Sequence, residues 1–135
     1  MKALIDSNVF IADWHKRDQN NAQAGQILRA FADGKIERLY TTNLIVSEAV
    51  SFLLRKASFE LALEMYTYLM RADRITIYYV DRSMETNMWH SFTTYKVLTL
   101  ADCSLLALSE MLSIKKLFSF DQGFDRVKEI ERVEA

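Results

Sequence analysis

The chain of 135 residues contains no proline and only three glycines, which excludes a Pro- or Gly-rich linker and leaves no sign of a domain boundary. It also has no run of about 18 apolar residues, so no transmembrane helix is expected. Met1 and Lys2 lead directly into a short apolar stretch that Asp6 interrupts, so we expect no signal peptide. Half of the residues are hydrophobic, which is enough to bury a core. We therefore expect one cytoplasmic domain, residues 1–135, with no membrane association.

Cysteine and excess basic charge are also scarce. Cys103 is the only cysteine, which excludes an internal disulfide and a thiolate zinc cluster, and we interpret it as a small buried helix residue. His15 and His90 lie outside the acidic motifs described below, and neither is given a catalytic role. The 17 Lys and Arg residues are balanced by 18 Asp and Glu residues. If the chain binds nucleic acid, a local basic rim, a bound metal or a partner must supply the attraction.

Short apolar stretches alternate along the chain with longer stretches of helical periodicity. Strands are expected at residues 3–6, 39–41, 75–80, 116–120 and 130–133. Helices are expected between them, with a short helical turn near residues 124–128. This alternation favours an α/β fold, a three-layer α/β/α sandwich around a central, mainly parallel sheet.

Several helix ends are indicated by capping residues. Thr42 or Asn43 can cap the helix that follows the second strand, and Asp81 or Ser83 can cap a later one. Gly34 stands where a helix is expected to end. These signals place the expected helices between the expected strands.

One expected helix, residues 59–70, has more apolar positions than a single buried face needs. Apolar side chains recur at helical spacing at Phe59, Leu63, Tyr66 and Met70. We interpret this stripe mainly as core. The surplus predicts that a second subunit covers part of the helix, with Tyr66 and Leu69 as the exposed pair.

Four acidic residues stand where expected strands end or expected helices begin. They are Asp6, Glu48, Asp102 and Asp121. Ligands of parallel sheets bind beyond the carboxyl ends of the strands, so a fold of this class can gather these residues at one edge. Each residue also has an ordinary structural explanation, because acidic residues commonly cap helices and turns, and Thr99-x-x-Asp102 is close to a capping box.

The ordinary explanations weaken when the four residues are taken together. Glu48 lies in an apolar run whose other polar residues are Ser47 and Ser51. We therefore expect its side chain to be partly buried and to need a partner for its charge. Two carboxylates about 4 Å apart repel by roughly 4 kcal/mol at an effective dielectric of about 20. A cluster of acids therefore requires a cation, and Mg²⁺ or Mn²⁺ is expected because both prefer carboxylate and water oxygens.

The same motifs resemble those of a known family. The opening residues 4–8 (LIDSN), Ser47-Glu48 within a helix, Ala101-Asp102 at the start of a late helix, and residues 118–125 (FSFDQGFD) are together similar to a PIN domain, in particular to the VapC-like ribonucleases of toxin–antitoxin pairs. The resemblance covers essentially the whole chain. It implies a Mg²⁺- or Mn²⁺-dependent endoribonuclease that leaves a 5′-phosphate and a 3′-hydroxyl. It further implies homodimerisation and inhibition by a small antitoxin that reaches into the acidic pocket.

The resemblance also extends to residues around the four acids. Ser7, Asn8 and Ser119 are candidates to orient the carboxylates, with Ser119 standing where the family often has Thr. Asp125 is a candidate fifth carboxylate or, alternatively, a capping residue in the final turn.

Other functions and contacts remain open at this stage. Arg55, Lys96, Lys115 and Lys116 are either phosphate-binding or ordinary surface residues. Alternative functions are an RNA-processing PIN endonuclease without an antitoxin and a metal-free binding module with the same fold. A phosphoaspartyl receiver or a haloacid-dehalogenase-like hydrolase also begins with a strand that ends in Asp, but the latter requires a second acid where Asn8 stands.

Overall fold

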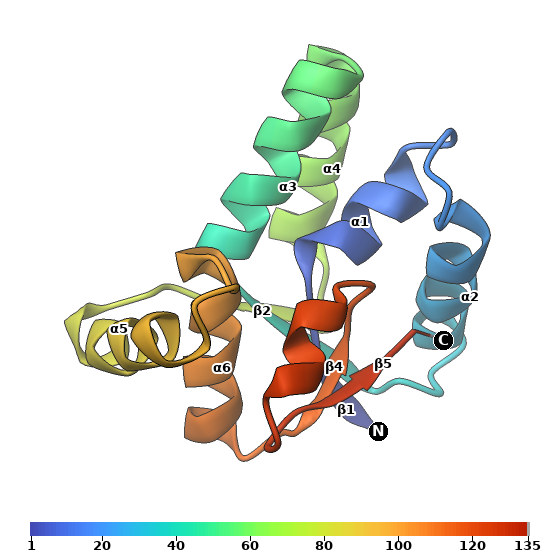
Figure 1. Ribbon diagram of the computed structural model, residues 1–135. Coiled ribbons are helices and arrows are strands. Elements are labelled where there is room, and N and C mark those ends of the chain that lie inside the picture. Colours follow the sequence, from blue (N-terminus) through green and yellow to red (C-terminus); the bar gives the residue numbers. More distant parts are fainter. Residues whose placement is uncertain (135) are drawn as a thin grey trace.

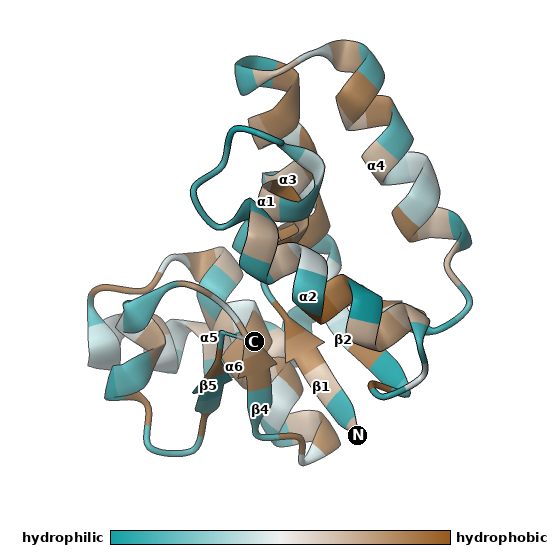
Figure 2. Cartoon of the chain, turned by 90° about the vertical axis from the view of Figure 1, so that its right-hand side faces the viewer, coloured by the Kyte–Doolittle hydropathy of each residue, from teal (hydrophilic) through white to brown (hydrophobic). Residues whose placement is uncertain are grey.

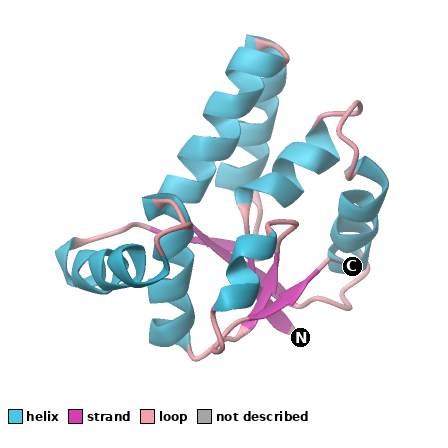
Figure 3. Cartoon of the chain, viewed as in Figure 1, coloured by secondary structure: helices cyan, strands magenta, loops and turns pink. Residues whose placement is uncertain are grey.

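A five-stranded sheet forms the middle layer of the protein in the computed structural model, which describes residues 1–134 (Figure 1, Figure 3). The strands are β1 (Lys2–Ile5), β2 (Arg38–Thr42), β3 (Ile75–Tyr78), β4 (Lys116–Phe118) and β5 (Glu131–Val133). Their order is β3-β2-β1-β4-β5, and every neighbouring pair is parallel. The chain therefore extends the sheet from β1 to one side first, through β2 and β3, and later to the other side, through β4 and β5.

The helices cover both faces of this sheet. They are α1 (Ser7–Trp14), α2 (Asn21–Ala32), α3 (Asn43–Lys56), α4 (Phe59–Arg71), α5 (Arg82–Tyr95), α6 (Leu100–Leu112) and the 3₁₀ helix η1 (Gln122–Arg126). The predicted caps at Thr42 and Asp81 are confirmed, since their side chains accept hydrogen bonds from the backbone N–H of Ile45 and Met84. Gly34 follows α2 with φ of +85°, a conformation that glycine adopts without strain. No described helix is long and apolar enough to cross a bilayer.

Two hydrophobic cores lie on opposite faces of the sheet, because successive strand residues point to opposite sides. Ala3 and Ile5 of β1 pack into the core shared with α1 to α4, whereas Leu4 packs into the core shared with α5 and α6. All three of these side chains are fully buried. The central strands are correspondingly apolar, and β1 is brown in Figure 2 except at its N-terminal end. The predicted three-layer α/β/α architecture is confirmed.

Helix α4 is oriented differently from the sequence-based expectation. The stripe expected to be core is exposed, with 61% of Phe59 and 45% of Tyr66 accessible to solvent. The buried residues of α4 are instead Ala62, Met65 and Leu69. Both stripes are apolar, so periodicity alone does not choose between them, and the stripe that contains the small Ala62 packs against α3. The prediction that Leu69 is exposed was wrong, and α3 and α4 project from the sheet as a helical pair (Figure 1).

Candidate metal centre

Asp6 is the first residue after β1 and is almost completely buried at the carboxyl edge of the sheet. Its backbone N–H donates to the carbonyl oxygen of Phe118 on β4, which fixes its position beside that strand. As the N-cap of α1, it accepts a hydrogen bond at Oδ1 from the backbone N–H of Ser7, at 2.7 Å. Its Oδ2 accepts from the hydroxyl of Ser119 at 2.7 Å and from the amide of Asn8 at 3.2 Å. Asp6 is thus both a helix cap and a firmly oriented carboxylate.

Glu48 and Asp102 come from helices on different sides of Asp6. Glu48 lies on α3, is partly buried as expected, and accepts a short hydrogen bond from the hydroxyl of Ser7. Asp102 lies in the first turn of α6, and its Oδ2 accepts from the backbone N–H of Thr99 at 2.9 Å. The reciprocal bond from Asp102 N–H to the Thr99 hydroxyl completes a capping box. The capping function predicted as an alternative for Asp102 is therefore real, and it orients a carboxylate that is almost completely buried.

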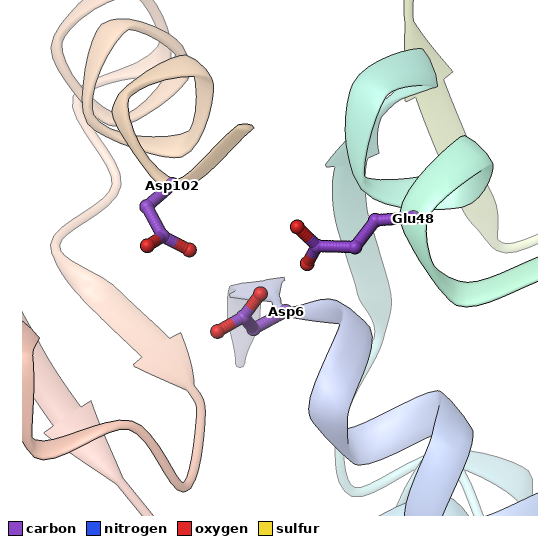
Figure 4. A group of neighbouring side chains, drawn as sticks. All are labelled: Asp6, Glu48 and Asp102. Carbon is purple, nitrogen blue, oxygen red and sulfur yellow. The ribbon is translucent and has the colours of Figure 1, made fainter. Parts of the chain in front are cut away.

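The three carboxylates converge. One oxygen from each of Asp6, Glu48 and Asp102 lies within 4.8 Å of the others. Figure 4 shows their carboxyl groups turned toward one another from the start of α1, from α3 and from α6. Carboxylate oxygens this close together suit a single hard cation such as Mg²⁺ or Mn²⁺, which binds oxygen ligands. The donor set consists of carboxylates alone, which fits such a cation and does not favour a softer one.

The electrostatics of the group indicate that it needs a positive charge. Burial raises the pKa of Asp6 to about 7, and the neighbouring carboxylates of Asp102 and Glu48 add to that effect. Burial likewise raises the pKa of Asp102 to about 6, with further contributions from Asp121 and Glu48, although the bonds from Thr99 oppose the shift. A divalent cation would remove this penalty by favouring the ionised forms.

The raised pKa of Asp6 predicts how stability changes with pH. The folded protein holds the Asp6 proton more tightly than the unfolded chain does, so its stabilising contribution is complete below about pH 4 and is lost as pH rises through about 7. The loss is at most about 4 kcal/mol, from about three pKa units at about 1.4 kcal/mol each. We expect Asp6→Asn to raise the melting temperature of the metal-free protein more at pH 8 than at pH 5. Thermal unfolding at the two pH values, with EDTA present, measures this difference.

The amide introduced by Asp6→Asn cannot reproduce every hydrogen bond of the carboxylate, and this loss lowers the melting temperature of the variant. Comparing the two pH values within each protein cancels that contribution. Asp33→Asn serves as the control, because Asp33 is exposed at the end of α2. An Asp6→Asn effect that is equal at the two pH values would contradict the raised pKa.

Asp121 lies next to this group without joining its closest contacts. It caps η1, accepting at Oδ1 from the backbone N–H of Gly123 at 2.8 Å, and its own N–H donates to the Ser119 hydroxyl at 3.0 Å. The same Ser119 hydroxyl donates to Asp6, which places Asp121 beside the other acids, and the charge of Asp121 adds to the raised pKa of Asp102. A Cβ at Gly123 would lie 3.0 Å from Asp121 Oδ1, so glycine permits this close turn. The structure therefore brings three of the four predicted acids into one cluster and leaves the fourth beside it.

Asp125 has a different partner. Both of its carboxylate oxygens bind Arg132 on β5, at 2.8 and 3.1 Å, and this pairing lowers the pKa of Asp125. The carboxylate is largely exposed. Asp125 therefore pairs with Arg132 and is not part of the converging acidic group. Arg132 was not singled out from the sequence, where no local motif distinguishes it.

The three predicted orienting residues all bind the acidic cluster. Ser7 bonds to both Asp6 and Glu48, and Asn8 bonds to Asp6 and to the Ser119 hydroxyl. Asn8 also accepts from the backbone N–H of Phe120 at 3.1 Å, so it links the start of α1 to the segment after β4. Together these hydrogen bonds fix the orientation of the Asp6 and Glu48 carboxylates.

Removing one of these bonds should weaken the cluster without removing a ligand. We expect Ser119→Ala to lower divalent-metal affinity about 10- to 100-fold, because its hydroxyl orients Asp6. Mn²⁺ binding measured by calorimetry checks this. Ser109→Ala is a matched control, because Ser109 is a buried serine like Ser119. Its hydroxyl donates to the backbone carbonyl of Ile114 and not to a carboxylate. Equal affinities for the wild type and Ser119→Ala would contradict the orienting role.

The basic residues left open by the sequence occupy different places. Arg55 is exposed near the end of α3, and Lys96 is exposed at φ of +64° in the turn between α5 and α6. Lys116 pairs with Glu131 across β4 and β5, at 3.8 Å. Lys115 lines a cavity of about 510 Å³ between α5, α6 and the C-terminal segment. Lys116 is thus an ion-pair partner within the sheet, and Lys115 is part of the wall of that cavity.

Comparison with known proteins identifies the family. A model of the PIN domain matches residues 3–130. The chain belongs to the PIN domain family. The fold agrees with that assignment, and acids from three separate elements converge at the carboxyl edge of its sheet. Comparison with curated protein sequences gives no match.

Solved structures similar to this PIN domain include proteins of toxin–antitoxin systems. VapC20 of Mycobacterium tuberculosis, described as a sarcin-ricin loop cleaving toxin, has a TM-score of 0.83 at 15% identity and covers 93% of this chain and 95% of its own. VapBC2 of Rickettsia felis, bound to a DNA fragment from its promoter, has a TM-score of 0.72 at 10% identity with 98% of both chains covered. A toxin–antitoxin complex from Klebsiella pneumoniae has a TM-score of 0.68 at 16% identity, covering 96% of this chain and 95% of its own. At these identities the similarity establishes a shared fold.

Proposed function

We propose that this PIN domain is a divalent-metal-dependent endoribonuclease and the toxin of a toxin–antitoxin pair. The observation that carries the proposal is the convergence of Asp6, Glu48 and Asp102 at the carboxyl edge of the sheet. The similarity in fold to VapC20, described as a toxin that cleaves the sarcin-ricin loop, supports RNA as the substrate class. The three converging groups are all carboxylates, so carboxylate chemistry is what they provide.

Each residue of the cluster has a defined part in this chemistry. Asp6, Glu48 and Asp102 would hold Mg²⁺ or Mn²⁺, with Asp121 as a fourth carboxylate. When bound, the cation would activate water and offset negative charge on the phosphate. Ser7, Asn8 and Ser119 orient the carboxylates through the hydrogen bonds described above.

A cognate antitoxin is part of the proposal. The buried acidic cluster would attract a cationic side chain of a partner protein, which would compete with the metal for the same oxygens. Toxin–antitoxin complexes are among the proteins with a similar fold, which supports such a partner here. The alternative of a PIN endonuclease without an antitoxin is tested by whether the gene has a neighbour whose product binds and inhibits this protein.

A homodimer is also proposed. The exposed apolar face of α4 borders a groove of about 300 Å³ between α3, α4 and β3. Tyr66 and Met70 line this groove together with Val46, Val50 and Tyr79. An exposed apolar surface of this kind beside an apolar groove suits a self-complementary, two-fold contact.

Introducing charge into this face should separate the subunits. We expect Leu63→Glu combined with Tyr66→Glu to convert a dimer into a monomer, because both side chains are about half exposed and would be buried at the contact. Light scattering at micromolar concentration measures the mass. Met111→Glu is the control, since Met111 is 52% exposed on α6 and lies outside this face. A monomeric wild type would contradict the dimer.

The activity is tested by incubating the purified protein with structured RNAs, including ribosomal and transfer RNA, with Mn²⁺ or EDTA. Metal-dependent internal cleavage that leaves 5′-phosphate ends is the expected result, and ligation of an adaptor to those ends detects it. Binding of RNA without cleavage under all metal conditions would favour the non-catalytic binding module instead.

A further inference from the structure

One arginine holds both ends of the segment that carries the fourth acid. Arg132 on β5 donates from Nη1 to the carbonyl oxygen of Ser119, at 3.2 Å. Its Nε and Nη2 donate to the two oxygens of Asp125. Ser119 and Asp125 stand at the beginning and the end of residues 119–125, and Asp121 lies between them. Only 12% of the Arg132 side chain is exposed.

The contacts of this guanidinium fix the orientation of its partners more than they stabilise the fold. A planar guanidinium that binds both oxygens of a carboxylate fixes relative orientation, which a lysine ammonium does not. The Asp125 side chain is 56% exposed, so solvent screens this ion pair and reduces its contribution to overall stability. β5 is also joined to β4 independently, by the backbone bond from Ser119 N–H to the Val133 carbonyl, at 3.2 Å. The arginine is therefore not needed to attach β5.

The segment that Arg132 holds, residues 119–125, lies directly beside the acidic cluster. The hydroxyl of Ser119 accepts from Asp121 N–H at 3.0 Å and donates to Asp6 Oδ2 at 2.7 Å. The segment that Arg132 holds thus contacts Asp6 directly, through Ser119.

We propose that Arg132 is a positioning residue of the metal centre, which holds Asp121 within reach of the cation by fixing both ends of residues 119–125. The inference rests on the proposed function in one respect, that the acids bind a divalent metal. It assigns Asp125 a role as the partner of Arg132, in place of the ligand role predicted from the sequence.

Mn²⁺ affinity, followed by electron paramagnetic resonance of the free ion, tests this without RNA. We expect Arg132→Ala and Arg132→Lys each to weaken Mn²⁺ binding about 10-fold, within the range known for residues that orient metal ligands. Lys116→Ala is the matched control. It breaks the ion pair with Glu131, which joins β4 to β5, and contacts no residue of the segment 119–125 through that pair. Unchanged affinity in Arg132→Ala, or an equal loss in Lys116→Ala, would overturn the proposal.

A double variant separates positioning from a general loss of structure. Asp121→Asn should itself weaken Mn²⁺ binding, and adding Arg132→Ala to it should weaken binding by less than about twofold more. If Arg132 acts through overall stability, the two effects should multiply, as they do for independent sites. Multiplied effects would overturn the proposal, whatever the melting temperatures.

The outcome is distinguishable from failure of the proposed function. Mn²⁺ binding that depends on Arg132, in a protein that cleaves no RNA, would support the positioning role and contradict the ribonuclease activity. A wild type that binds no Mn²⁺ would overturn both.

Discussion

Replacing Asp6 or Asp102 with Asn is expected to lower metal-dependent RNA cleavage more than about 100-fold. Substitution of residues that only orient metal ligands typically costs 10- to 100-fold, so removal of a ligand should cost more. Both side chains are almost completely buried, and their raised pKa values show that burial and neighbouring carboxylates disfavour the ionised forms. Asn is similar in shape but lacks the charge that attracts the cation. The rate of cleavage at saturating Mn²⁺ measures the effect.

The folded state of the variants decides how a loss of activity is interpreted. Because each substitution removes a crowded carboxylate, the metal-free variants should melt at the wild-type temperature or slightly above it. Asp33→Asn, which removes one exposed charge at the end of α2, should retain full activity. If the variants unfold, the residues are structural. If folded variants still cleave RNA, the active site lies elsewhere.

Binding of Mn²⁺ is expected to raise the melting temperature of the wild-type protein by about 10 °C at a concentration about 100 times the dissociation constant. Binding to the folded state alone stabilises it by about 2.7 kcal/mol at that ratio. A chain of 135 residues should gain about 4 °C for each kcal/mol. Differential scanning fluorimetry with and without Mn²⁺ measures the shift at constant ionic strength.

This stabilisation should depend on pH and on Glu48. The pKa values of Asp6 and Asp102 are raised to about 7 and about 6, so protons compete with the metal at pH 5 and the shift should shrink there. Glu48→Gln should abolish most of the shift at pH 8, because one of the three converging carboxylates is lost. Full stabilisation of Glu48→Gln by Mn²⁺ would place the cation at another site.

The acids of the site differ in how well the sequence predicts them. Asp6 is predictable because an apolar strand that ends in Asp is a local pattern, and the carboxyl edge follows from the parallel sheet. Glu48 is predictable because its apolar surroundings leave it no polar face. Asp102 is predicted both as a cap and as a metal ligand, and the structure gives it the cap while turning it toward the other acids.

The features that sequence reasoning missed depend on contacts between elements. The pairing of Asp125 with Arg132 requires η1 and β5 to come together, and nothing in the seven-residue spacing indicates it. The buried face of α4 was mistaken because both of its faces are apolar and the choice is made by packing against α3. Periodicity finds apolar faces, but tertiary packing decides which one is buried.

The strand order also determines when during synthesis the site can form. β4 lies between β1 and β5, so β1 lacks one of its two neighbours until residues 116–118 have left the ribosome. A nascent chain that ends before Asp102 carries only Asp6 and Glu48 of the converging group, and Ser119 and Asp121 follow later still. A nascent chain that lacks these later residues therefore has no assembled metal site. For a protein proposed to cleave RNA in the cell that makes it, this topology delays hydrolysis until the segment that follows β4 has been synthesised.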